Sequence, residues 1–142
     1  MRYLFLIVLI FSFSFANSFK RDSIRKVVID TTAKLMWVDD ISVVNILKTH
    51  DEAEIYCKTL NYAGFKNWRI PELEELELIV DKKNEKNYIN KAFRFNVPDG
   101  YWAKKAHWRT LWFYADYMHF VSGTPYFDSR HKKKYVRCVR NF

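Results

Sequence analysis

Few side chains in this 142-residue sequence have the type and spacing that catalysis or metal binding needs. The chain has two cysteines, Cys57 and Cys138, and four histidines, and none of them falls into a CxxC or HxxxH pattern. Zinc sites usually use such closely spaced ligands, and no GxSxG nucleophile motif occurs either. The sequence therefore predicts no metal, no cofactor and no recognisable catalytic apparatus.

Basic and aromatic side chains gather instead in the last third of the sequence. Residues 100–142 contain nine Lys or Arg and two Asp, whereas residues 17–99 contain fourteen charges of each sign. The candidate ligand-binding residues are Lys104, Lys105, His107, Trp108, Arg109, Arg130, Lys132, Lys133 and Lys134. Clustered cations attract anionic partners, and an exposed Trp ring can stack on a sugar. We therefore expect an acidic glycan or another polyanionic surface as partner.

Other interpretations of these clusters stay open. Both could be solvated loops that only keep the protein soluble, or the surface could recognise another envelope protein. An enzyme with an unrecognised site is a third class, and nothing indicates a specific nucleic-acid partner. Salt-sensitive binding would favour a polyanion, whereas a salt-tolerant complex would favour a protein partner.

The start of the sequence has the pattern of an export signal. Arg2 precedes an uncharged, mostly apolar run over residues 3–15, and Ser14 and Ala16 form a small-residue cleavage site. A membrane-spanning helix needs about 20 apolar residues, and an uncleaved anchor is the alternative. We expect a signal peptide at residues 1–16, a periplasmic or secreted protein, and no membrane contact after cleavage.

The rest of the chain has the length of about one domain. Apolar residues make up 49% of the sequence and aromatic residues 18%, and no repeat or linker interrupts it. We expect a flexible segment at residues 17–26 and one domain over residues 27–142. Short apolar, β-prone runs predict strands at residues 27–29, 35–38, 101–103, 110–114 and 118–122, and alternation of apolar and polar residues predicts one at 135–140. A turn at Asp116 and a polar loop at 123–134 separate the last of these, and residues 39–48 fit either a strand or a loop.

Two helices are expected in the first half of this domain. Thr49 followed by Glu52 forms a capping box, and apolar residues at helical spacing place Cys57 on the inner face. Gly64 is the expected stop of this helix, and Pro71 is expected at or near the first position of the second. Helices followed by antiparallel strands indicate an α+β domain.

Cys57 and Cys138 admit one intramolecular pairing. In an oxidising compartment, a disulfide is the default state of such a pair. It would link the first helix to the last strand and contribute about 4 kcal/mol. Two free buried thiols are the alternative.

Several short motifs occur in an order that resembles one family of exported bacterial domains. They are Leu35-Met36-Trp37, Tyr56-Cys57, Asn67-Trp68-Arg69-Ile70-Pro71, Tyr101-Trp102 and Val136-Arg137-Cys138-Val139-Arg140. Over about residues 27–140 this series resembles the Lcl C-terminal domain family, long described as a domain of unknown function. The resemblance implies a C-type-lectin-like, formylglycine-generating-enzyme-like fold: a single α+β domain with two helices packed on antiparallel strands and one disulfide.

The resemblance also implies structural roles for its landmark residues, which are Trp37, Trp68, Arg69, Pro71, Trp102 and Arg137. We expect the three tryptophans in the core, with a sugar-stacking platform as the alternative. Arg69 is expected in an internal ion pair or in bonds to backbone carbonyls, with anion binding as the alternative. Arg137 and Arg140 are expected to pair with helix acids such as Glu74 or Glu77.

Two departures from the family and its chemistry limit what the resemblance implies. The chain has Ala33-Lys34 where Thr-Gly is usual, and Glu72 where a hydroxyl cap is usual. Formylglycine generation needs two reactive cysteines, and a Cys57–Cys138 disulfide would leave none. We therefore expect a binding module without catalysis.

Overall fold

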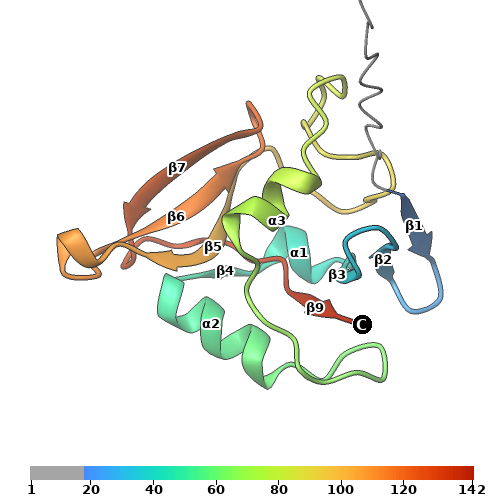
Figure 1. The fold of residues 1–142 in the computed structure, drawn as a ribbon, viewed down its shortest axis with the longest axis horizontal. Helices are drawn as coiled ribbons and strands as arrows, with labels where there is room; N and C mark the ends of the chain where they lie inside the picture. The colour runs from blue at the N-terminus through green and yellow to red at the C-terminus, as the bar shows by residue number, and fades with distance from the viewer. Residues whose placement is uncertain (1–17) are drawn as a thin grey trace, which may run out of the picture.

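The computed structural model describes residues 18–142, which form two sheets and a few short helices (Figure 1). The expected signal peptide, residues 1–16, lies outside the described residues. The first sheet has the strand order β1-β2-β3-β9, with strands at Phe19–Asp22, Val27–Asp30, Leu35–Val38 and Val139–Asn141. The second has the order β4-β8-β5-β6-β7, with strands at Leu47–Lys48, Lys134–Tyr135, Gly100–Ala106, Tyr114–His119 and Thr124–Ser129. The fold is therefore α+β, as predicted.

In the part of the chain that the structure describes, three α-helices and one 3-10 turn complete the fold. They are α1 (Ser42–Asn45), α2 (His50–Thr59), α3 (Leu73–Leu78) and η1 (Trp108–Thr110). Within residues 18–142, none of them combines the length and hydrophobicity that a membrane crossing requires. The predicted capping box starts α2, because the backbone N–H of Thr49 donates to the Glu52 carboxylate at 2.9 Å. The helix ends at Thr59, earlier than expected, and Gly64 lies in a separate turn with φ +79°.

Pro71 precedes α3 by two residues, near the first helical position as expected. Glu72 is the N-cap, and its backbone N–H donates to the Glu75 carboxylate at 2.8 Å. The Glu75 carboxylate thus closes the first turn of α3 from inside the helix. The Pro71 carbonyl accepts a bond from the backbone N–H of Lys104 at 2.8 Å and so joins this junction to β5.

The core lies between the sheets and the helices and includes the three landmark tryptophans. Trp37 and Trp102 are fully buried and Trp68 nearly so, which confirms the core assignment over the sugar-stacking one. The predicted disulfide is also confirmed: Cys57 and Cys138 are both buried and bonded, and they join α2 to the residue before β9. Burial of this many large rings supplies the main driving force for folding.

Residues 18–26 are ordered in strand and turn, which corrects the expected flexible segment. Strand β1 pairs with β2, with Phe19 opposite Asp30 and Asp22 opposite Val27. Arg21 of β1 donates through Nε to the Asp39 carboxylate at 2.5 Å. This polar stretch forms an edge strand because one of its charges has a buried partner far along the chain.

The expected turn at Asp116 is wrong, because β6 runs through it without interruption. Asp116 is buried, and its carboxylate lies 2.5 Å from the His107 ring, so its polar group is satisfied within a strand. The turn follows at residues 120–123, where Gly123 has φ +66°. Strand β7 then occupies part of the expected polar loop.

The expected closing strand over residues 135–140 is divided between the two sheets. Strand β8 pairs with β4 and β5, residues 136–138 cross over, and β9 pairs with β3. The chain changes sheet here because Cys138 is held by the disulfide and Arg137 points into the core. The terminal segment therefore fastens the two sheets together.

Arg137 does not pair with Glu74 or Glu77, and this corrects the expectation. It is fully buried and donates to the Val38 carbonyl at 2.8 Å and to the Asp39 carboxylate at 3.3 Å. A buried guanidinium without such partners would cost several kcal/mol. Its anion is 98 residues away in sequence, so no local spacing rule could identify it.

The other two arginines of the landmark motifs also have defined partners. Arg69 forms the predicted internal ion pair, with its two terminal nitrogens 2.8 and 2.6 Å from the Glu75 oxygens. Arg140 was expected beside α3 as well, but its Nε donates to the Lys66 carbonyl at 3.2 Å, and its guanidinium lies over the Phe65 ring. These contacts fix the junction between β9 and the segment before α3.

Candidate functional site

The loop that follows β5 carries the most prominent group of candidate ligand-binding residues. A pocket of about 310 Å³ opens here, lined by Lys105, His107, Trp108 and Arg109. All four were expected from the sequence to bind a ligand together, and the structure places them on one surface. We call these four residues the basic pocket.

A buried carboxylate positions the His107 side of the basic pocket. Asp116, from the middle of β6, bonds His107 Nε2 and thereby fixes the imidazole at the end of β5. The His107 carbonyl accepts bonds from the backbone N–H of Trp112 and the hydroxyl of Thr110, both at 2.9 Å. The loop after β5 is therefore held at its base by defined polar contacts.

The two cations of the basic pocket have no acidic partner in the described residues, unlike Lys104, Arg130, Lys132 and Lys134. Among residues 18–142, neither Lys105 nor Arg109 forms an ion pair. The Arg109 guanidinium lies 5.6 Å from the centre of the Trp108 ring, whose side chain is 65% exposed. Their charges are therefore available to an anionic ligand.

Four other predicted ligand-binding cations already pair with acidic side chains of the fold; three are lysines, and the fourth, Arg130, is described below. Lys104 lies 3.2 Å from Glu72, and Lys132 and Lys134 lie 3.4 and 2.9 Å from Asp128. Burial alone would raise the pKa of Asp128, but the bond from Lys134 lowers it below the usual value. Exposed pairs such as the Lys132 one are weak, yet they reduce the net positive charge that a ligand would meet.

Lys134 has a structural role in addition to its ion pair. Its ammonium lies 3.9 Å from the centre of the Tyr117 ring and 5.3 Å from that of Trp102, and its side chain is largely buried. A cation held between two aromatic faces stabilises the sheet that it lies on. Of the three expected lysines of this segment, Lys133 alone is exposed without an ion pair in the described residues.

Arg130, the fourth of these cations, is used in a cluster that sequence reasoning missed. His50, Asp51 and Glu54 each offer a possible metal-ligand atom, all within 4.8 Å of one another. Arg130 Nε donates to His50 Nδ1 at 3.2 Å, and its Nη2 is paired with Asp51. Burial lowers the pKa of His50. An arginine thus already neutralises the acidic end of α2, so this cluster does not fit a cation site.

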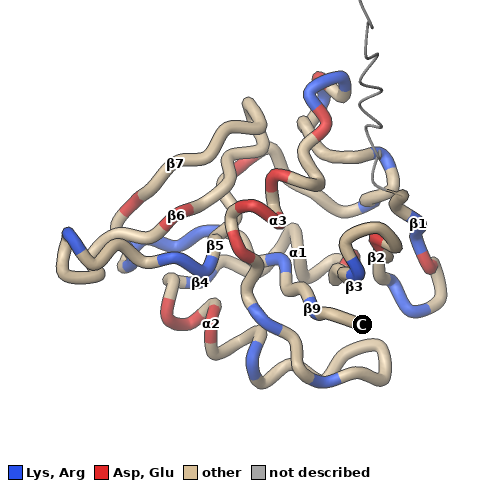
Figure 2. Tube along the Cα trace, in the orientation of Figure 1, with Lys and Arg blue, Asp and Glu red and all other residues tan. Residues whose placement is uncertain are grey.

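Arg130 also links the two predicted basic clusters. Its backbone N–H donates to the Phe113 carbonyl at 3.0 Å, and its Nη1 donates to the Trp112 carbonyl at 3.1 Å. The neighbouring His131 ring lies 5.3 Å from the Phe113 ring. Figure 2 shows basic residues along β5.

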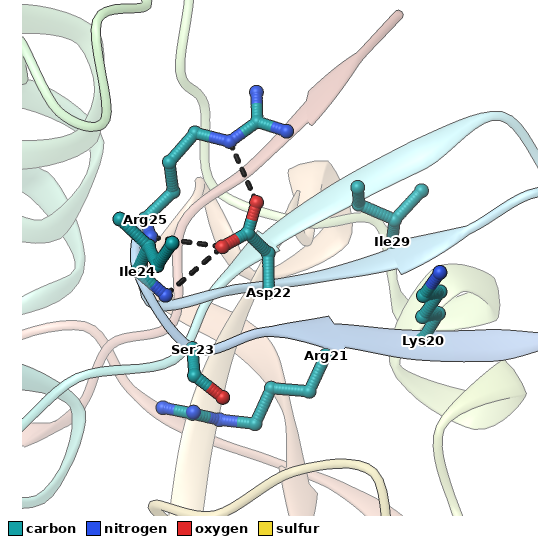
Figure 3. Close-up of a pocket in the computed structure, with 7 residues that line it drawn as sticks. All are labelled: Lys20, Arg21, Asp22, Ser23, Ile24, Arg25 and Ile29. Atoms are coloured by element: carbon teal, nitrogen blue, oxygen red, sulfur yellow. Dashed lines mark hydrogen bonds and ion pairs between the residues drawn. The ribbon is translucent and has the colours of Figure 1, made fainter.

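A larger pocket, of about 440 Å³, lies at the other end of the molecule, on the β1–β2 hairpin (Figure 3). It is lined by Lys20, Arg21, Asp22, Ser23, Ile24, Arg25 and Ile29. The Asp22 carboxylate turns onto the backbone N–H groups of Ile24 and Arg25 and onto the Arg25 side chain. Its polar groups thus stabilise the hairpin turn itself, and the basic pocket is the better candidate site.

Comparison with known proteins agrees with the motif order in the sequence. No curated protein sequence matches this chain. The family model described as the Lcl C-terminal domain matches residues 26–140, which is most of the chain. The match includes both cysteines of the disulfide, all three buried tryptophans and the basic pocket. The chain therefore belongs to the Lcl C-terminal domain family.

Proposed function

We propose that this protein is an exported, non-enzymatic binding module that recognises an anionic surface, such as an acidic glycan, through the basic pocket. The observation that carries the proposal is the pairing of two uncompensated cations, Lys105 and Arg109, with the exposed ring of Trp108. Cations of this kind attract an anionic partner, while the ring offers a face for stacking.

Two features support binding rather than catalysis. The chain's two cysteines are bonded to each other, so formylglycine-type chemistry has no thiol. The side chains that line the basic pocket include an imidazole held by Asp116 but no hydroxyl or thiol nucleophile. We therefore assign His107 a positioning role in the pocket wall.

The test is binding to immobilised heparin and to hyaluronate at low and at physiological salt. We expect measurable affinity at low salt that falls steeply as salt rises, because exposed charges are screened within about 8 Å at physiological ionic strength. The Lys105→Gln/Arg109→Gln variant should bind about tenfold more weakly, since each exposed charge contact contributes up to about 1 kcal/mol.

The matched control removes the same charge elsewhere. Lys20 in β1 and Lys91 are both exposed and lie outside the basic pocket, and Lys20→Gln/Lys91→Gln should bind as the unchanged protein does. Lys132→Gln should have a smaller effect than the pocket variant, because Lys132 is already paired with Asp128. Equal losses in the pocket variant and the control would refute a defined site and leave only net charge.

A further inference from the structure

The loop after β5 exposes an unusual concentration of large apolar side chains. Trp108, Leu111, Trp112 and Phe113 are 65%, 84%, 57% and 52% exposed. Single exposed apolar residues are common on protein surfaces, but a contiguous group marks an interaction site. We call residues 107–113 the apolar loop. In Figure 1 it is the orange loop that projects at the left, beyond the ends of β5 and β6.

The backbone of the apolar loop is strained in a way that keeps these side chains outside. Leu111 and Trp112 are consecutive residues with φ of 52° and 57°, in the left-handed region. That region is unfavourable for residues other than glycine, by roughly 1–2 kcal/mol each, and such strain persists where the surrounding contacts enforce it. Here the bonds from Trp112 N–H to the His107 carbonyl and from Arg130 to the Trp112 carbonyl enforce it.

The apolar loop and its neighbours contain the residue types that proteins place at a membrane–water interface. Tryptophan is enriched at that interface because its ring is apolar and its N–H is polar. Lys105 and Arg109, the two uncompensated cations, lie at the loop's base and within it. Basic residues next to inserted apolar ones are the arrangement by which peripheral proteins bind anionic lipid.

We infer that the apolar loop inserts Leu111 and Trp112 into the headgroup layer of an anionic lipid bilayer, with Lys105 and Arg109 on the lipid phosphates. This inference rests on the proposed function, since it names a lipid surface as the source of the anions. The loop projects from the molecule, so a flat and deformable surface can receive it without a matching cavity. Lipid binding by the apolar loop also differs from the expectation that only the signal peptide contacts a membrane.

The experiment measures binding to vesicles of phosphatidylcholine alone and of phosphatidylcholine with phosphatidylglycerol. Residues 1–16 are removed, because that apolar run would bind lipid by itself, and all the core contacts described above lie within residues 18–142. Sedimentation with vesicles gives the bound fraction. Tryptophan emission, with quenching by brominated acyl chains, reports insertion, since three of the five tryptophans are buried and the other two lie in the apolar loop.

The test variant is Leu111→Asn/Trp112→Asn, because asparagine tolerates the left-handed region. The variant should therefore keep or raise the midpoint of thermal unfolding while binding anionic vesicles about tenfold more weakly. The matched control is Ile24→Asn, which removes an apolar side chain that is 94% exposed on the β1–β2 hairpin. The control should bind vesicles as the unchanged protein does.

The expected result is binding to anionic vesicles with a blue shift and quenching of tryptophan emission, both lost in the test variant. Anionic vesicle binding without a blue shift, equal for the protein and the test variant, would overturn the inference and leave the proposed charge-based function intact. Binding to heparin but not to vesicles would also overturn it, in favour of an acidic glycan. Binding to neither would overturn both proposals.

Discussion

The disulfide should account for a large share of the protein's stability, and its removal is a sharp test of the fold. Cys57 and Cys138 are separated by 81 positions. On the chain-entropy relation, closing a loop of that length in the unfolded chain contributes about 4.5 kcal/mol at 25 °C. Folded domains of this size are typically stable by about 5–15 kcal/mol. Loss of the bond should therefore bring the protein close to its unfolding threshold.

Both cysteines are replaced in the variant Cys57→Ala/Cys138→Ala. Alanine is used and not serine, because serine would bury an unpaired hydroxyl. Urea unfolding followed by tryptophan fluorescence should show a loss of about 4.5 kcal/mol, and the thermal midpoint should fall by about 17 °C. The slope of the transition should rise as well, since the uncrosslinked unfolded chain exposes more surface. The single Cys57→Ala variant removes the same crosslink and should lose a similar amount.

A loss below about 2 kcal/mol would refute this reasoning, because it would mean that the unfolded chain stays compact without the bond. A large loss with an unchanged slope would point instead to damage in the native core. The two readouts together separate an effect on the unfolded state from one on the folded state.

Three further substitutions test buried charges. Asp39→Asn should cost about 3–5 kcal/mol in urea unfolding, because it leaves the Arg137 guanidinium buried without its anion; a loss under 1 kcal/mol would contradict this. Burial alone would raise the pKa of Glu75, but its bonds with Arg69 lower it below 4.5, so its contribution is present above that pH. The cost of Glu75→Gln should therefore shrink as the pH falls below 4.5. Burial lowers the pKa of His50 below 6.5, so stability should fall as the pH drops through 6.5, and His50→Gln should flatten that dependence.

Local rules predicted the parts of the fold that depend on near neighbours in sequence. The capping box at Thr49, the segments that form β2 and β3 and the apolar face of α2 all follow from patterns of a few residues. The pairing of Cys57 with Cys138 followed from there being no other cysteine. Each of these features is confirmed by the structure.

The errors arose where a polar residue finds a distant partner. Asp116 looked like a turn residue because its bond with His107 cannot be seen in the sequence. The charged segment around Arg21 looks flexible in the sequence, because its buried anionic partner, Asp39, is identified only by the tertiary structure. A polar side chain in a strand or core is stable only with a partner, and that partner is set by the tertiary fold.

The candidate site was also predictable only in part, because local sequence shows residue types but not distant partners. Residue type and clustering were enough to nominate the basic pocket, and its four side chains do line one surface. The sequence could not show that Arg130 and Lys134 are used internally, by His50, Asp51 and Asp128. Nor did it indicate the left-handed backbone that exposes the apolar loop.

The division of the closing segment between two sheets has a consequence for how the molecule is made. Strand β3 lacks its second neighbour until β9 arrives, and β4 and β5 are joined only through β8. The same segment brings Arg137 and Cys138 to their partners. A nascent chain therefore cannot complete either sheet while residues 134–141 are still inside the ribosome. Completion of both sheets thus depends on a segment that is synthesised after every strand it pairs with.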